Sequence, residues 1–115
     1  MTVKILHNPR CSKSRATLAL LQEHGIEPEI KRYLDTPPSP GELHGILKKL
    51  GMKPRQLMRK GEAEYAALAL DDPGLSDDEL INFMVAHPRL IERPIVLANR
   101  KAAIGRPPEA VLGIL

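Results

Sequence analysis

The residue types most able to do chemistry stand together near the start of the chain, in the run His7-Asn8-Pro9-Arg10-Cys11-Ser12-Lys13-Ser14-Arg15. Cys11 is the only cysteine among 115 residues. The run lies between a short apolar stretch, Val3 to Leu6, and a helical pattern that ends near Gly25. A thiol in a strand-to-helix turn meets unpaired backbone N–H groups and the positive end of the helix dipole, and both favour the thiolate. Because the thiolate is the nucleophile, we interpret Cys11 as a reactive site.

Neighbouring side chains in the same run bring positive charge and hydroxyl groups to this thiol. Arg10, Lys13 and Arg15 add cations, and the hydroxyls of Ser12 and Ser14 can cap the helix or donate to the sulfur. His7 has two open roles: a protonated ring that lowers the pKa of the thiol, or a neutral, hydrogen-bonded ring that anchors the turn. The alternative is an inert cysteine that merely packs, since free cysteine is often buried. Several cations and hydroxyl groups would be unfavourable surroundings for an inert, buried thiol, so we favour the reactive interpretation.

Length and composition predict one soluble domain spanning residues 1–115. Hydrophobic residues make up 43% of the chain and charged residues 27%, values typical of globular proteins. A single cysteine leaves no intramolecular disulfide, so a redox cycle needs an outside thiol. With no recognisable signal peptide and no apolar run of membrane-spanning length, we expect a cytoplasmic location and no membrane partner. The formal charge of +3 is spread along the chain, and we expect no nucleic-acid partner.

Hydrophobic periodicity predicts a βαβ unit at the start of the chain. The first strand covers Val3 to Leu6, the helix follows Cys11, and Ile26 to Leu34 carries a second strand. In the second strand we expect Ile30 and Tyr33 to pack against the core.

The middle of the chain, from about residue 39 to 87, is predicted to be entirely helical. Ser39-Pro40-Gly41-Glu42 and Ser76-Asp77-Asp78-Glu79 are typical capping boxes. Two short helices are expected between the helices that these boxes begin, one from Pro54 through Met58 and one over 64–70. Strand patterns return at 95–97 and 101–104, with a turn expected at Asn99-Arg100 that would pair the two strands as a hairpin. A last helix follows Gly105-Arg106-Pro107. The predicted fold is α/β: βαβ, an inserted helical block, then ββα around a mixed four-stranded sheet.

This order of elements, with a reactive cysteine after the first strand, resembles the thioredoxin-like plan. Together with His7-Asn8-Pro9-x-Cys11 and Glu92-Arg93-Pro94-Ile95-Val96, it resembles the glutaredoxin-linked arsenate reductase family over essentially the whole chain. The resemblance implies that Cys11 attacks arsenate and that three arginines bind the oxyanion: Arg59, Arg93 and Arg106. It also implies that the peptide bond before Pro94 is cis.

The resemblance further implies how the reaction is completed. Arsenate forms an adduct with Cys11, glutathione acts as an external thiol reductant, and glutaredoxin clears the resulting mixed disulfide. No bound cofactor is expected, and the remaining histidines lack partners at metal-ligand spacing, so no metal is assigned. Each arginine also has a simpler interpretation as a surface charge. For Arg59 that interpretation is an ion pair with Glu62 or Glu64.

Two other classes of protein stay open. The first is a general glutathione-dependent thiol oxidoreductase on the same fold. The second resembles the Spx-type regulators that bind RNA polymerase, although these usually carry a Cys-x-x-Cys switch and the chain has Cys11-Ser12-Lys13-Ser14. A low-molecular-weight phosphatase-like reductase is disfavoured, because its Cys-x5-Arg loop would need an arginine where this chain has Thr17.

Overall fold

The computed structural model describes residues 2–115 and divides the chain into two compact units. One unit, here called the sheet unit, contains the residues up to Thr36 together with Arg93–Leu115. The other, the helical unit, is Pro37–Glu92. The single-domain organisation expected for residues 1–115 stays a prediction.

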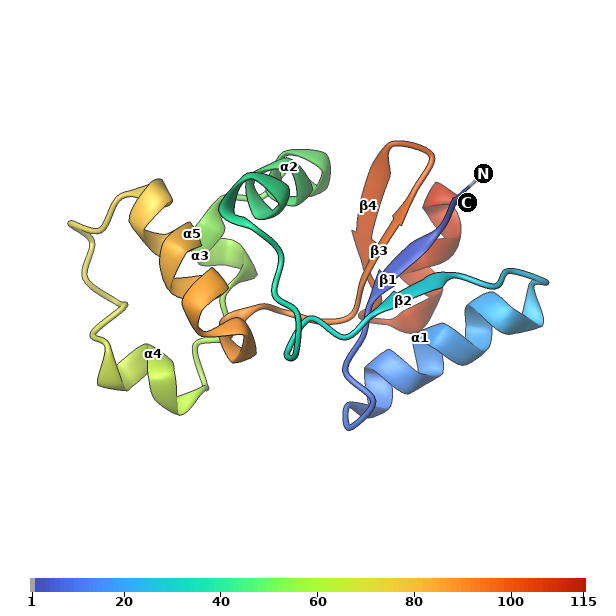
Figure 1. Cartoon of the computed structure of the whole chain (residues 1–115), viewed down its shortest axis with the longest axis horizontal. Coiled ribbons are helices and arrows are strands. Elements are labelled where there is room, and N and C mark those ends of the chain that lie inside the picture. Colours follow the sequence, from blue (N-terminus) through green and yellow to red (C-terminus); the bar gives the residue numbers. More distant parts are fainter. Residues whose placement is uncertain (1) are drawn as a thin grey trace. The chain divides into compact units, whose positions relative to one another are not determined.

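The sheet unit is built on four strands: β1 (Lys4–Leu6), β2 (Glu29–Lys31), β3 (Ile95–Ala98) and β4 (Lys101–Ile104). Their order in the sheet is β2-β1-β3-β4 (Figure 1). β1 and β2 are parallel, whereas β3 is antiparallel to both β1 and β4. The mixed four-stranded sheet and the thioredoxin-like order of elements are therefore confirmed.

Two helices cover one face of this sheet and hold the end of β1 in place. They are α1 (Ser12–Glu23) and η2 (Pro108–Ile114), and η2 is a 3₁₀ helix in the position where the sequence predicts a last helix. The core that they share with the sheet is made of buried aliphatic residues: Val3, Ile5, Leu21, Val96, Ala98 and Val111. Burying a leucine or isoleucine contributes about 1.5–3 kcal/mol. This packing fixes the start of α1, and with it Cys11, just beyond the end of β1.

The second strand is shorter than predicted, and the prediction that Ile30 packs in the core is wrong. β2 covers only Glu29–Lys31, because the backbone turns where Asp35 and Thr36 donate to the carbonyl of Arg32. Tyr33 is buried as expected, but Ile30 is 47% exposed. β2 pairs only with β1, so it is an edge strand with a neighbour on one side. Alternation alone does not show where a strand lies in its sheet.

The hairpin between β3 and β4 confirms the predicted turn. Asn99 and Arg100 both have positive φ, 53° and 61°, and Ala98 pairs with Lys101 across the turn. Two consecutive left-handed residues are typical of the tight turns that match the twist of a hairpin.

The helical unit contains α2 (Pro40–Leu50), α3 (Pro54–Leu57), α4 (Ala63–Ala67), α5 (Asp77–Ala86) and the 3₁₀ helix η1 (Pro88–Leu90). Both predicted capping boxes are present, at Ser39 with Glu42 and at Ser76 with Glu79. α5 packs against α2, α3 and η1. Apolar side chains from these helices are buried: Leu43, Ile46, Leu47, Leu57, Leu80, Ile81, Met84 and Leu90. Within residues 2–115, no helix has the length and apolar character needed to cross a membrane.

Candidate active site

Cys11 is the N-cap of α1 and closes the turn that leads into the helix. Its backbone N–H donates to the carbonyl of Asn8 at 3.0 Å, and its own carbonyl accepts from the N–H of Arg15 at 3.0 Å. The residue has extended backbone angles and is 7% exposed. The sequence therefore predicted correctly that the thiol lies where a strand gives way to a helix.

Several groups act on the pKa of the Cys11 thiol, and their sum lowers it. Burial is the largest single influence and acts to raise this pKa. The backbone N–H groups of Ser14 and Lys13 oppose it by hydrogen bonding to the sulfur. The positive charges of Arg93 and Arg106 also oppose it, and together these effects outweigh burial. A larger fraction of Cys11 is therefore thiolate at neutral pH than in an ordinary cysteine.

Arg106 reaches the sulfur directly. Its Nη2 donates to Cys11 Sγ at 3.7 Å, although the two residues are 95 positions apart. Its Nε donates to the carbonyl oxygen of Arg93 at 2.8 Å. Two separate donors of one guanidinium are thus oriented at once, which is possible because the guanidinium is a rigid planar fork.

The segment that carries Arg106 is held against α1 by a close approach between backbone and side chain. Gly105 donates its N–H to the carbonyl of Pro94 at 2.9 Å. Thr17, fully buried in α1, directs its hydroxyl to the carbonyl oxygens of Lys13 at 2.8 Å and Gly105 at 3.5 Å. A Cβ on Gly105 would lie 2.3 Å from Thr17 Oγ1 and 2.8 Å from Pro94 Cγ. Only glycine fits at this position without a shift of its neighbours.

Neither Thr17 nor Gly105 was recognised from the sequence as part of the site. In the sequence, Thr17 served only to argue against the Cys-x5-Arg loop of a phosphatase-like reductase. Gly105 was noted only as part of the segment that precedes the last helix. The expected cis bond before Pro94 is present, and the bond between Arg106 and Pro107 is also cis. Because Gly105 donates its N–H to the carbonyl of Pro94, the segments that contain Arg93-Pro94 and Arg106-Pro107 lie next to each other.

His7 lies beneath the turn and is hydrogen-bonded to Ser14. The two side chains are buried, with His7 Nδ1 2.6 Å from Ser14 Oγ, and the N–H of Asn8 donates to the same oxygen at 3.0 Å. Burial, and then the charges of Arg32 and Arg15, lower the pKa of His7. Of the two roles open for this residue, the geometry favours the neutral ring that anchors the turn.

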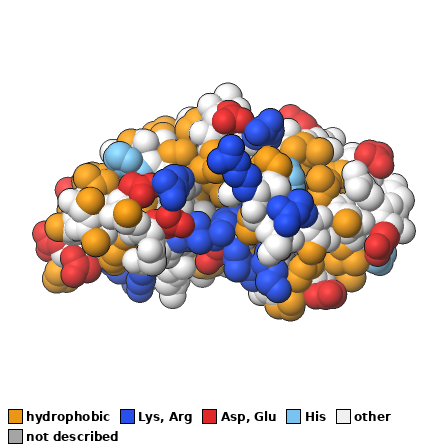
Figure 2. All heavy atoms as spheres, turned by 90° about the horizontal axis from the view of Figure 1, so that it is seen from below, with side chains coloured by type: hydrophobic (Ala, Val, Ile, Leu, Met, Phe, Trp, Pro, Cys, Tyr) orange, Lys and Arg blue, Asp and Glu red, His pale blue; other side chains and the backbone are white. Residues whose placement is uncertain are grey.

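The other cations of the turn are exposed. Arg15 donates from Nη1 to the carbonyl of Pro9 at 3.0 Å, so its side chain also braces the turn. The side chain of Arg10 is exposed as well. Figure 2 shows the molecule from below, and blue Lys and Arg side chains stand out on this face among hydrophobic ones. The exposed cations of the turn suit it to an anionic ligand.

Arg59 belongs to the helical unit and is held there by carboxylates. Its N–H donates to the carbonyl of Leu90 at 2.7 Å. Its guanidinium forms an ion pair with Glu62, and its Nε lies 3.9 Å from an oxygen of Glu92. The ion pair with Glu62 is the one that the simpler interpretation expected. The convergence of Arg59 on Cys11 is not tested and stays a prediction.

No group of three or more His, Cys, Asp or Glu residues is placed to hold a metal ion in the part of the chain that the structure describes.

The fold and this site define a class of protein: a thioredoxin-like α/β protein with its cysteine at the start of the helix after β1 and an arginine from a distant segment at the sulfur. Comparison with known proteins identifies the family. The model of the ArsC family matches residues 6–114, so the chain belongs to the ArsC family.

Similar proteins cover nearly the whole chain. The uncharacterized protein YfgD of Escherichia coli K12 is 58% identical over 98% of this chain and 96% of its own length. A Haemophilus influenzae protein named arsenate reductase is 53% identical over the full length of both chains. The solved structure of an arsenate reductase from Vibrio cholerae is 53% identical and has a TM-score of 0.97, covering 100% of this chain and 98% of that one.

Proposed function

We propose that this protein reduces arsenate to arsenite through a covalent adduct on Cys11, with glutathione and glutaredoxin as the sources of electrons. The observation that carries the proposal is the guanidinium of Arg106, 3.7 Å from a thiol whose pKa is lowered. Similar proteins that are named arsenate reductase support the choice of oxyanion. A cytoplasmic location, where thiols stay reduced, goes with this proposal.

The arginines address the main physical obstacle to the reaction. Arsenate is an anion at neutral pH, so its attack by a thiolate brings two negative charges together. An arginine stays charged at every physiological pH and gives paired hydrogen bonds to an oxyanion. Arg106 and Arg93 supply this charge within the sheet unit, where both lower the pKa of Cys11. Arg59 is proposed as the third arginine that binds the oxyanion.

In the first step, the Cys11 thiolate attacks arsenic and forms a sulfur–arsenic bond, while one arsenate oxygen leaves as water after protonation. In the second step, a glutathione thiolate attacks Sγ of Cys11. The sulfur–arsenic bond breaks and its electron pair stays on arsenic, which is thereby reduced from As(V) to As(III). The products are arsenite and a mixed disulfide between Cys11 and glutathione. Because Cys11 is the only cysteine, glutaredoxin must then reduce that disulfide with a thiol of its own.

The supporting residues keep the thiol and the arginines in place. His7, Ser14 and Arg15 hold the turn through the hydrogen bonds described above. Pro94 accepts the N–H of Gly105 at its carbonyl, which orients the segment that carries Arg106. Their role is positioning. The turn sets where the sulfur lies, and Pro94 sets where Arg106 would bind the oxyanion.

A coupled assay with arsenate, glutathione and glutaredoxin tests the proposal. We expect NADPH-linked turnover, through glutathione reductase, that requires both glutathione and glutaredoxin and is abolished in Cys11→Ser. Serine keeps nearly the same shape but is barely ionised at neutral pH, so the loss would reflect chemistry. Circular dichroism of the variant controls for folding.

A general glutathione-dependent thiol oxidoreductase is the second candidate, because a lowered thiol pKa would equally serve disulfide exchange. The same assay separates the two. If wild type and Cys11→Ser are equally inactive with arsenate, while only wild type exchanges with glutathione disulfide, the second function is the correct one.

A further inference from the structure

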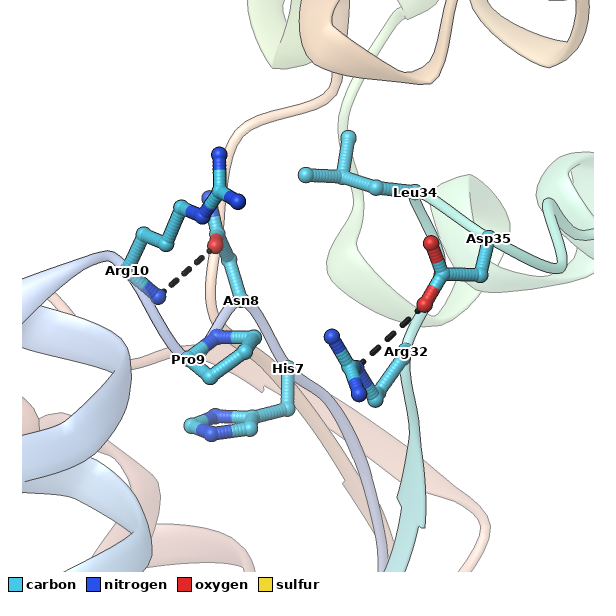
Figure 3. Close-up of a pocket in the computed structure, with 7 residues that line it drawn as sticks. All are labelled: His7, Asn8, Pro9, Arg10, Arg32, Leu34 and Asp35. Carbon is cyan, nitrogen blue, oxygen red and sulfur yellow. Dashed lines mark hydrogen bonds and ion pairs between the residues drawn. The ribbon is translucent and has the colours of Figure 1, made fainter.

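A pocket of about 180 Å³ opens beside the turn that carries Cys11, within the sheet unit. Residues 7–10 form one wall, and Arg32, Leu34 and Asp35, which follow β2, form the other (Figure 3). Neither Arg93 nor Arg106 lines it. The pocket is therefore lined by other side chains than these two guanidinium groups, although it borders the thiol-bearing turn.

The walls of this pocket carry a positive charge that is only partly balanced. Arg10 and Arg32 are both exposed, one on each wall. The Nε of Arg32 lies 3.3 Å from an oxygen of Asp35, and both side chains are more than 60% exposed. Figure 3 shows the guanidinium of Arg32 across the pocket from His7, and its charge contributes to the lowered pKa of that residue. Leu34 adds an apolar group that points into the gap (Figure 3).

In the second step of the proposed reaction, the outside thiol needs a binding site on the side of Sγ that faces away from arsenic. Displacement at sulfur runs in line, so the incoming thiolate and the departing arsenic lie on opposite sides of Sγ. Arg106 donates to Sγ from the segment that is assigned to the oxyanion. The outside thiol then approaches from a side other than that of Arg106, and the pocket is formed in part by residues 7–10, which directly precede Cys11 in the turn.

We propose that this pocket binds the carboxylate-bearing end of the outside thiol that resolves the Cys11 adduct, and so selects anionic thiols such as glutathione. The inference rests on the proposed function for its place in the reaction. Arg10 and Arg32 pair with a carboxylate, and Leu34 covers the adjoining methylene groups. A pocket of this size takes part of a tripeptide, with the thiol left outside it to reach Sγ. Asp35 opposes the binding, since it competes with the carboxylate for Arg32.

Disulfide exchange tests the pocket without arsenate. The Cys11 thiolate attacks one sulfur of glutathione disulfide, a Cys11–glutathione disulfide forms, and one glutathione thiolate leaves. Cys11 is oxidised and one half of the reagent is reduced, so electrons balance. The neutral reagent hydroxyethyl disulfide reacts in the same way but brings no carboxylate. Mass spectrometry gives the rate constant with each reagent, and the ratio of the two constants measures selectivity for the anionic partner.

Two exposed substitutions should move this ratio in opposite directions. We expect Arg32→Gln to lower it by about threefold to tenfold and Asp35→Asn to raise it, with the rate for hydroxyethyl disulfide nearly unchanged. Lys101→Gln removes an exposed cation from β4, outside the pocket, and is the matched control; it should leave the ratio as in wild type.

Equal changes with both reagents would overturn the proposal, because Arg32 would then act on the reactivity of the thiol and not on binding. An unchanged ratio in both pocket variants would overturn it as well. If selectivity follows the pocket charge while arsenate turnover is absent, the docking site stands and the arsenate reductase function fails. The two failures are thus distinguishable.

Discussion

Two arginines assigned to the same oxyanion have different surroundings in the two units. In the sheet unit, Arg106 donates to a carbonyl oxygen and to the sulfur of Cys11. In the helical unit, Arg59 is paired with Glu62 and lies near Glu92. Glu62 also pairs with Arg89, so the helical unit holds this cation inside a network of opposite charges. The positive charge of Arg106 acts on the thiol, whereas that of Arg59 is largely balanced by carboxylates.

The difference shows that one residue type can serve two purposes within one proposed site. A guanidinium beside a thiol stabilises the thiolate before any substrate is bound. A guanidinium paired with carboxylates must share or exchange those partners when an oxyanion arrives. We therefore expect Arg106 to affect both thiol reactivity and oxyanion binding, and Arg59 to affect oxyanion binding alone.

The largest expected effect comes from Arg106→Lys. Lysine keeps the charge but cannot direct two fixed donors to the Arg93 carbonyl and the sulfur, so we expect kcat/KM for arsenate to fall by about tenfold to a hundredfold, about 1–3 kcal/mol in transition-state stabilisation. Arg100→Lys, the same change in the exposed hairpin turn, is the control and should leave kcat/KM unchanged. We expect a smaller loss from Arg59→Lys; an equal one would show that Glu62 yields to the oxyanion and would remove the contrast between the two arginines.

Glycines in the two units should respond to alanine with opposite signs. Gly105→Ala places a Cβ against Thr17 and Pro94, and we expect a loss of about 1–3 kcal/mol in the free energy of unfolding together with weaker turnover. Gly45 lies in α2, where an added Cβ would have open space around it, and alanine there should stabilise the protein by about 0.5–1 kcal/mol. Urea unfolding measures both. Full stability in Gly105→Ala would show that the Arg106 segment is not held by this close approach.

The pH dependence of Cys11 alkylation tests the claim that the sheet unit activates its thiol. Burial acts to raise the pKa of Cys11, but the N–H groups of Ser14 and Lys13 and the charges of Arg93 and Arg106 lower it overall. A lowered pKa favours the thiolate, so the alkylation rate should rise with pH through an inflection below the ordinary thiol value of about 8.5. Arg106→Gln removes one charge and should move the inflection upward. Arg59→Gln should leave it in place. An inflection at the ordinary value in wild type would remove the argument for activation.

The smallest expected effect comes from Glu62→Gln in the helical unit. It removes the carboxylate that pairs with Arg59, so the guanidinium becomes more available to an anion and KM for arsenate should fall. The pair is partly exposed, and its loss should lower the free energy of unfolding by no more than about 1 kcal/mol. Steady-state kinetics and thermal unfolding measure the two changes. A rise in KM would show that Glu62 orients Arg59 for binding.

The sequence by itself determined the features that depend on near neighbours. The capping boxes at Ser39 and Ser76, the hairpin turn at Asn99 and Arg100, and the place of Cys11 at the start of α1 were all predicted and are present. Each is settled by hydrogen bonds and backbone angles within a few residues, so the local pattern contains the needed information. The order of the four strands and of the α-helices followed from the same kind of pattern, whereas the 3₁₀ helix at Pro88–Leu90 was not predicted.

The tertiary structure alone decided which distant groups meet. Arg106 reaches Cys11 across 95 positions because β3 pairs with β1, β4 pairs with β3, and Gly105 packs on Thr17. Local propensity does not predict that approach, because neither the glycine nor the threonine indicates by itself which distant residue it will contact. The exposure of Ile30 has the same origin, because an edge strand differs from a central one only in what lies beside it. Local hydrogen bonding sets the elements, and long-range packing sets the site.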